Sequence, residues 1–175
     1  MRRVFQSKRI SYRVPQLSDA QAIFESYASD TEVTKYLSWA RHQVVADTEA
    51  FLEFAQAQWA EWKIGPLLLE CVDTGQLLGS TGLDRVDKNT ASTGYVIARD
   101  FWGRGLASEA LGSMIEIAVQ HDFQKVFAFC HRDHLVSRRV LERNGFSYKT
   151  CYEKRLVFPN LSAIPQDVCE YEYQC

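Results

Sequence analysis

The chain has 175 residues, a formal net charge of -2 and 46% hydrophobic residues. These values are typical of one globular domain with a buried core, which we expect to span residues 1–175. The charge argues against a general electrostatic grip on nucleic acid, and no apolar run is long enough for a signal peptide or a membrane span. The five scattered cysteines, an odd number, indicate reduced thiols in a cytoplasmic protein.

The predicted elements alternate in a way that is typical of an α/β domain. In chain order we expect a strand (10–14), a helix (18–29), an irregular segment (30–43), a helix (47–64), two strands joined by a hairpin turn (67–72 and 77–83), a strand (91–98), a helix (107–118), a strand (126–130), a helix (136–143) and two antiparallel strands (148–158 and 168–173). Ser18 with Gln21 would cap the first helix, and Asp47 or Thr48 the second. The strand at 126–130 is apolar throughout, which favours parallel pairing within one mixed sheet that carries helices on both sides.

The most informative stretch joins the strand at 91–98 to the helix at 107–118. Gly103 and Gly105 lie between them, and glycine lets the backbone approach a ligand that a Cβ would block. Unpaired N–H groups and a partial positive charge at the start of a helix bind anions. The stretch therefore predicts a site for a phosphate or pyrophosphate group.

Two common nucleotide-binding loops do not fit this stretch. A P-loop ends in Gly-Lys-Ser or Gly-Lys-Thr, which is absent here. A dinucleotide-binding loop needs a third glycine where Ser108 stands, and an acidic residue at the end of the next strand, which closes instead with His131 and Arg132. The sequence therefore argues against a nicotinamide-dependent oxidoreductase.

Three separate motifs resemble those of the GNAT acetyltransferases. Trp102-Gly103-Arg104-Gly105-Leu106-Ala107 resembles the family signature that binds the pyrophosphate of acetyl-CoA. Residues 137–146 resemble a second signature of the family, and residues 33–39 resemble the branch that acetylates the N-termini of ribosomal proteins. The resemblance covers about residues 10–146 and implies a central, mostly antiparallel sheet with one parallel strand pair and helices on both faces.

The resemblance implies a role for each matching residue. Acetyl-CoA would be the acetyl donor, and backbone N–H groups near Val96 and Ile97 would bind the thioester oxygen. Ser137 would protonate the departing thiolate, and Tyr171 and Tyr173 are the alternatives for that role. The residues assigned to acetyl-CoA are Val96, Ile97, Arg99, Trp102, Gly103, Arg104, Gly105, Leu106, Ala107, Ser108, His134 and Ser137.

The resemblance assigns fewer residues to the binding site of the amine acceptor than to that of acetyl-CoA. The resemblance places Tyr36 and Trp39 in the wall of the acceptor site. Ser92 stands where relatives often carry a glutamate that could act as the general base. The sequence therefore does not identify the group that takes a proton from the amine, and a chain of water molecules could also serve. The candidate carboxylates are Asp84, which we also assign to the acceptor site, Glu70 and Glu170.

Two further departures from the family pattern affect the expected site. Trp102 stands where many members carry glutamine or arginine, which leaves a cradle made of backbone N–H groups intact. His134 stands where many carry asparagine. An imidazole titrates near neutral pH unless it is perturbed, so His134 is either a proton relay or an ordinary surface histidine.

The sequence thus predicts an acetyl-CoA-dependent N-acetyltransferase whose acceptor is a primary amine, on a protein N-terminus or on a small molecule. The alternative is a non-catalytic acyl-CoA-binding or sensing module, because Ser92 and His134 replace expected polar groups. Residues 130–134 include zinc-ligating residue types, but no second cluster completes a site, so we expect no metal. We expect no nucleic-acid or membrane partner, and a homodimer is left open.

Overall fold

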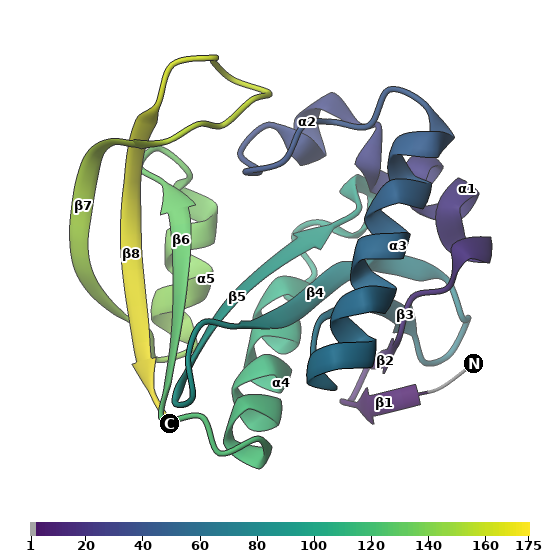
Figure 1. Ribbon diagram of the computed structural model, residues 1–175, viewed down its shortest axis with the longest axis horizontal. Coiled ribbons are helices and arrows are strands. Elements are labelled where there is room, and N and C mark those ends of the chain that lie inside the picture. The colour runs from purple at the N-terminus through teal and green to yellow at the C-terminus, as the bar shows by residue number, and fades with distance from the viewer. Residues whose placement is uncertain (1–2) are drawn as a thin grey trace.

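The computed structural model describes residues 3–175, which form an eight-stranded sheet with helices on both faces (Figure 1). The strands are β1 (Arg3–Gln6), β2 (Ile10–Arg13), β3 (Pro66–Cys71), β4 (Leu77–Arg85), β5 (Thr90–Ile97), β6 (Lys125–His131), β7 (Ser147–Leu156) and β8 (Gln166–Gln174). They lie in the order β1-β2-β3-β4-β5-β6-β8-β7. Within the described residues β5 and β6 run parallel, and the other neighbouring strands are antiparallel.

Helices cover the two faces of this sheet. They are α1 (Ala20–Ile23), α2 (Thr31–Thr34), α3 (Val45–Trp62), α4 (Leu106–Gln120) and α5 (Leu135–Arg143). α4 packs on β4 and β5 with α5 beside it, whereas α1 and α3 lie on the opposite face (Figure 1). Among the described residues, no helix has the length and apolar character needed to cross a membrane.

Side-chain alternation along β3 builds a core on each face of the sheet. Leu67 and Leu69 pack in a cluster with Met114 of α4. Leu68, which lies between them, packs instead with Leu52 of α3 and Ile23 of α1. Successive side chains of a strand point to opposite faces, so one apolar strand holds both helical layers in place.

The expected α/β architecture is confirmed. The differences are shifted element ends, a π-helical turn (Phe24–Ala28) in the second half of the helix expected over 18–29, and the additional elements β1 and α2. The first helix is not capped by Ser18 and Gln21 as expected. Instead, Asp19 accepts the N–H of Gln16 (2.7 Å), and a 3₁₀ turn precedes α1. Asp47 likewise lies inside the first turn of α3 and accepts the N–H of Val44 (3.2 Å), so this helix begins two residues earlier than expected. β1 was not expected from the sequence.

β5 and β6 pair only over their first residues and then diverge (Figure 1). The parallel register ends where Ser92 meets Phe127. From there β6 continues beside β8 as far as His131. The divergence leaves Phe129 48% exposed, so the strand expected to be buried throughout is buried on one side only. This opening in the middle of the sheet positions the site.

Candidate active site

The opening between β5 and β6 forms part of a cleft of about 800 Å³. Its other walls come from β4, α3, α5 and the segments that follow α2 and β7. This volume lies in the range of small-molecule sites. The predicted site residues that line the cleft are Tyr36, Trp39, Asp84, Val96, His134 and Ser137. The glycine stretch lies just beyond, at the C-terminal end of β5.

The diverging edge of β5 directs backbone N–H groups toward the cleft. The N–H of Ala98 donates to the carbonyl of Leu78 (2.8 Å), beside β4. Hydrogen-bonding sides alternate along a strand, so Val96 also faces β4, whereas Tyr95 and Ile97 face the gap that β6 leaves. The sequence placed these donors near Val96 and Ile97. The strand register, which the sequence does not reveal, favours Ile97 and Tyr95 instead.

The glycine stretch has the backbone geometry of an anion site. Gly103 and Gly105 both adopt φ of +74°, in the left-handed region that glycine enters without strain. The side-chain Nε1 of Trp102 donates to the carbonyl of Ile97 (2.7 Å) and ties the stretch to the end of β5. The N–H groups of residues 106–108 form the first turn of α4, where a helix offers no internal acceptor. Together with the helix dipole they suit a diphosphate.

The arginines near this stretch differ in what they already contact. Arg99 forms an ion pair with Asp30 (2.5 Å) and so holds the segment around α2 against the end of β5. Arg104 is exposed and donates to a backbone carbonyl one turn earlier. Arg9 pairs with Glu109 of α4 (2.7 Å) and donates to the carbonyl of Arg104 (2.8 Å). The sequence does not reveal the place of Arg9, because only the folded sheet brings this distant residue beside the loop.

Ser137 faces the cleft from the first turn of α5. Its hydroxyl shares a hydrogen bond of 3.0 Å with the hydroxyl of Tyr95. Burial raises the pKa of Tyr95 to about 12, although the bond to Ser137 opposes the rise. Tyr95 therefore keeps its proton at neutral pH and can donate it to Ser137. The sequence does not reveal the contact of Tyr95 with Ser137, because the pattern of β5 does not show which residue of α5 lies opposite.

The structure does not bring Tyr171 and Tyr173 to the cleft. Tyr171 is fully buried, and its hydroxyl accepts from Arg138 Nε (2.9 Å) and donates to Glu142 (3.1 Å). Tyr173 packs against the core on the α4 side. Of the three predicted proton donors, Ser137 is the one that lines the cleft.

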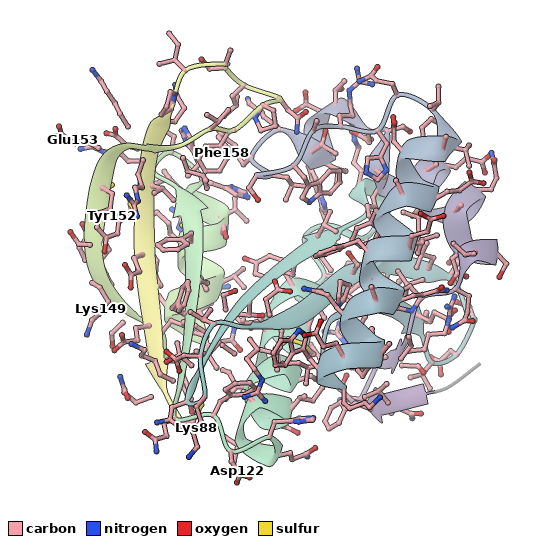
Figure 2. All side chains as sticks on the ribbon, viewed as in Figure 1. Lys88, Asp122, Lys149, Tyr152, Glu153 and Phe158 are labelled. Carbon is pink, nitrogen blue, oxygen red and sulfur yellow. The ribbon has the colours of Figure 1, made fainter. Side chains whose placement is uncertain are left out.

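The cleft is bridged by contacts that we call the roof, between the β7–β8 connection and the segment that follows α2. Asn160 donates to the carbonyl oxygens of Thr34 (2.8 Å) and Trp39 (2.9 Å). It also accepts the N–H of Arg41 (2.8 Å). The ring of Phe158, in the same connection, packs edge-on against His131 at the end of β6, with 4.9 Å between the ring centres; Figure 2 shows Phe158 near the upper end of that strand. The roof therefore fixes Trp39, the predicted acceptor residue, over the cleft.

His134 packs as an aromatic ring rather than as a charged group. It stacks on Tyr36, with 4.6 Å between the ring centres and 17° between their planes. Burial, with a smaller contribution from the nearby His131, lowers the pKa of His134 to about 4. The ring is therefore neutral at pH 7, which does not support the proton relay considered from the sequence.

Among the described residues, Asp84 is the one carboxylate that lines the cleft. It lies on β4 directly opposite Ser92 of β5. Asp84 is exposed at its position on β4, but partial desolvation raises its pKa, and a hydrogen bond with Gln58 of α3 offsets part of the rise. The other candidate carboxylates, Glu70 and Glu170, are held by partners outside the cleft.

Neither metal ligation nor a reactive thiol is favoured by the geometry. Within residues 3–175, no three His, Cys, Asp or Glu side chains are grouped so that they could hold a metal ion. Cys130 lines the cleft, but burial raises its pKa to about 12. A thiol in that state is a poor nucleophile at neutral pH.

Comparisons with known proteins agree with this geometry. Residues 9–147 match the family described as an acetyltransferase (GNAT) domain. The protein p20 of Bacillus licheniformis, an uncharacterized N-acetyltransferase, is 28% identical to this chain over 112 residues. The matched region is 63% of this chain and 62% of p20, so the chain spans less than two thirds of the length of p20. The fold is similar to that of a GNAT-family acetyltransferase from Bacillus anthracis (TM-score 0.83, 20% identity, 97% of this chain and 96% of that one). It is also similar to that of RimL, a ribosomal L7/L12 alpha-N-protein acetyltransferase solved in complex with coenzyme A (TM-score 0.85, 18% identity, 96% and 95%).

The family match covers most of the chain, and the glycine stretch and the parted strands lie inside it. The chain therefore belongs to the GNAT family of acetyltransferases.

Proposed function

We propose that this protein is an N-acetyltransferase that transfers the acetyl group of acetyl-CoA to the primary amine of a small molecule with an apolar body. The observation that carries the proposal is the cleft at the parted strands. Backbone donors, the Ser137 hydroxyl and the Asp84 carboxylate all border this one space. These are the groups that direct attack of an amine on a thioester requires.

The donor would lie across the parted strands. N–H groups in the first turn of α4 hold the diphosphate, and those of Tyr95 and Ile97 bind the thioester oxygen as negative charge develops on it. One such preorganised donor is worth about 3–4 kcal/mol to the transition state. A helix dipole acting on an exposed charge contributes about 0.3–1 kcal/mol. The strand donors would therefore control the rate, and the glycine stretch the affinity.

Proton transfer would use both ends of the cleft. Ser137 donates a proton to the departing thiolate and regains one from Tyr95, its hydrogen-bond partner. Asp84 accepts the proton of the amine. Asp84 is level with Ser92, about 10 Å along β5 from Tyr95, so water in the cleft would carry this proton. The raised pKa of Asp84 makes it a stronger base than a fully solvated aspartate.

The walls of the cleft support a small apolar acceptor. Phe127 and Phe129 line the β6 side, and Phe51 and Phe54 line the α3 side. Phe129 and Phe54 keep 48% and 55% of their surface exposed, so a ligand between them would bury apolar area. The roof restricts the space that a polypeptide would need, which favours a small molecule.

A protein N-terminus is the second candidate acceptor. The fold likeness to RimL favours it, because that protein is an N-terminal acetyltransferase of a ribosomal protein. Residues 33–39, which resemble that branch, lie at the cleft through Tyr36 and Trp39. A peptide would have to displace the roof or enter beside it.

Release of CoA measured with three amines tests the proposal: phenethylamine, spermidine and a peptide with an N-terminal serine. We expect the highest kcat/KM for phenethylamine. Phe54→Ala should lower that value roughly tenfold, the effect of losing most of a buried phenyl ring. Trp62→Ala is the matched control, because Trp62 is a half-exposed aromatic on the same helix outside the cleft. Preference for the peptide would favour the second candidate, and binding of acetyl-CoA without any transfer would favour a binding module.

A further inference from the structure

Three cysteines lie in one row across the last three strands of the sheet. Cys130 of β6 is opposite Cys169 of β8, and Cys169 is opposite Cys151 of β7. Residues directly opposite on neighbouring strands point to the same face, so the three thiols share the face that α5 covers. The proposed acetyl transfer uses neither Cys151 nor Cys169.

The pair formed by Cys151 and Cys169 has the geometry that a disulfide needs. The N–H of Arg132, next to β6, donates to the carbonyl of Asp167 on β8 (3.1 Å). Odd-numbered residues of β8 therefore direct their backbone polar groups toward β6. Cys169 thus meets Cys151 at a non-hydrogen-bonded position, where opposed Cα atoms lie about 4.5 Å apart. That separation suits a disulfide, and the two Sγ atoms are already 3.1 Å apart.

This pair also lies at the base of the roof. β7 leads from Cys151 into the connection that carries Phe158 and Asn160, and β8 leads from that connection back to Cys169. Figure 1 shows this connection rising from the upper ends of the two strands. A bond between the two sulfurs would close a ring that contains the whole connection. It would therefore restrain the segment that holds Trp39 over the cleft.

We propose that Cys151 and Cys169 form a reversible disulfide site that reacts with low-molecular-weight disulfides and restrains the roof. Cys151, the more exposed of the two, attacks one sulfur of oxidised glutathione as its thiolate and releases one glutathione thiolate. Cys169, also as its thiolate, then attacks the Cys151 sulfur, forms the internal bond and releases the second glutathione. The two protein thiols together lose two electrons and two protons, and the glutathione disulfide becomes two thiols.

The environment of the buried partner sets the rate of this exchange. Burial, and then the nearby Cys151, raise the pKa of Cys169 to about 11. Its thiolate is therefore scarce at neutral pH, and closure of the ring should accelerate as the pH rises. Arg138 and Arg132 lie near enough to oppose this rise through their charges.

The test is oxidation of the full chain with oxidised glutathione at pH 8, followed by intact mass and peptide mapping. We expect a loss of about 2 Da, a peptide that joins Cys151 to Cys169, and reversal by dithiothreitol. Cys151→Ser should abolish the loss, whereas Cys175→Ser, a matched change at an exposed cysteine, should leave it. Amide exchange over residues 157–165 should slow in the oxidised form.

Three results would overturn the proposal: a glutathione adduct on Cys151 that never resolves, a bond that joins Cys169 to Cys130, or no reaction at Cys169. Unchanged amide exchange over residues 157–165 would contradict the restraint on the roof. If Cys151→Ser does not fold, the mapped linkage of the unaltered protein decides the question.

Discussion

The proposed catalysis in this cleft depends, at the scale of single residues, on two hydroxyl groups that come from different elements. Tyr95 projects from β5 and Ser137 from α5, and they meet at 3.0 Å across the opened sheet. The raised pKa of Tyr95 keeps it a donor throughout the neutral range. Ser137 can therefore give its proton to a leaving thiolate and be reprotonated at once.

Ser137→Ala should lower kcat roughly 10²-fold, the low end for the loss of a general acid. CoA affinity should change little, because the proposed diphosphate site is built from backbone groups of α4. Tyr95→Phe keeps the ring and removes the hydroxyl, and its effect on kcat should be smaller because water can reprotonate Ser137. Steady-state kinetics together with calorimetric titration of CoA measure both effects. Full activity of Ser137→Ala across the pH range would remove Ser137 from the mechanism.

The buried ring of His134 leads to a prediction about stability rather than activity. Its pKa is about 4 in the folded protein and 6.5 in an unperturbed chain. As the pH falls below 6.5, the unfolded state takes up a proton that the folded state refuses. The free energy of unfolding should therefore decrease between pH 6.5 and 4, by at most about 3 kcal/mol from this residue, and stay level above that window.

His134→Asn should flatten this part of the pH dependence. Urea unfolding at pH 7.5 and pH 5, for both proteins, measures it. If both proteins lose the same stability between the two pH values, His134 is protonated in the fold as readily as outside it, and the assignment of a neutral stacked ring is wrong.

At the scale of elements, the connection from β5 to α4 links the two parts of the proposed donor site. One part would bind CoA, and the other would stabilise the transition state of acetyl transfer. The backbone of the connection fixes two left-handed glycines, and Trp102 ties it to the strand end that carries the proposed thioester donors. A Cβ added at Gly105 would lie 3.7 Å from the Arg9 guanidinium, which is ordinary contact. A substitution there would therefore act through the left-handed backbone and through the space that the ligand requires.

Gly105→Val should weaken CoA binding at least tenfold, as an order of magnitude for a blocked anion cradle. Gly75→Val is its matched control: Gly75 has φ of +70° in the β3–β4 turn, with nothing within 4 Å of an added Cβ. Both variants carry similar backbone strain and should lose similar stability. Calorimetry with CoA should separate them, and equal affinities of the folded variants would contradict the cradle.

At the scale of the whole molecule, the sequence predicts the features that depend on residues close together in the chain. Alternation predicts the sheet, and the two glycines with the following helix predict the diphosphate site. Contacts between distant segments are not encoded locally, so the sequence did not reveal Arg9 beside the loop, Tyr95 against Ser137 or the roof made by Asn160. For the same reason Tyr171 was a reasonable proton donor in the sequence, although the fold buries it.

The central claim is that the amine attacks the thioester directly within the cleft. A single-turnover rapid-quench experiment with acetyl-labelled acetyl-CoA and phenethylamine tests this claim most directly. We predict that label passes from acetyl-CoA to the amine at one rate, and that no label attaches to the protein when the amine is omitted. Label that accumulates on the protein, for example at Cys130, and only then moves to the amine would contradict direct transfer.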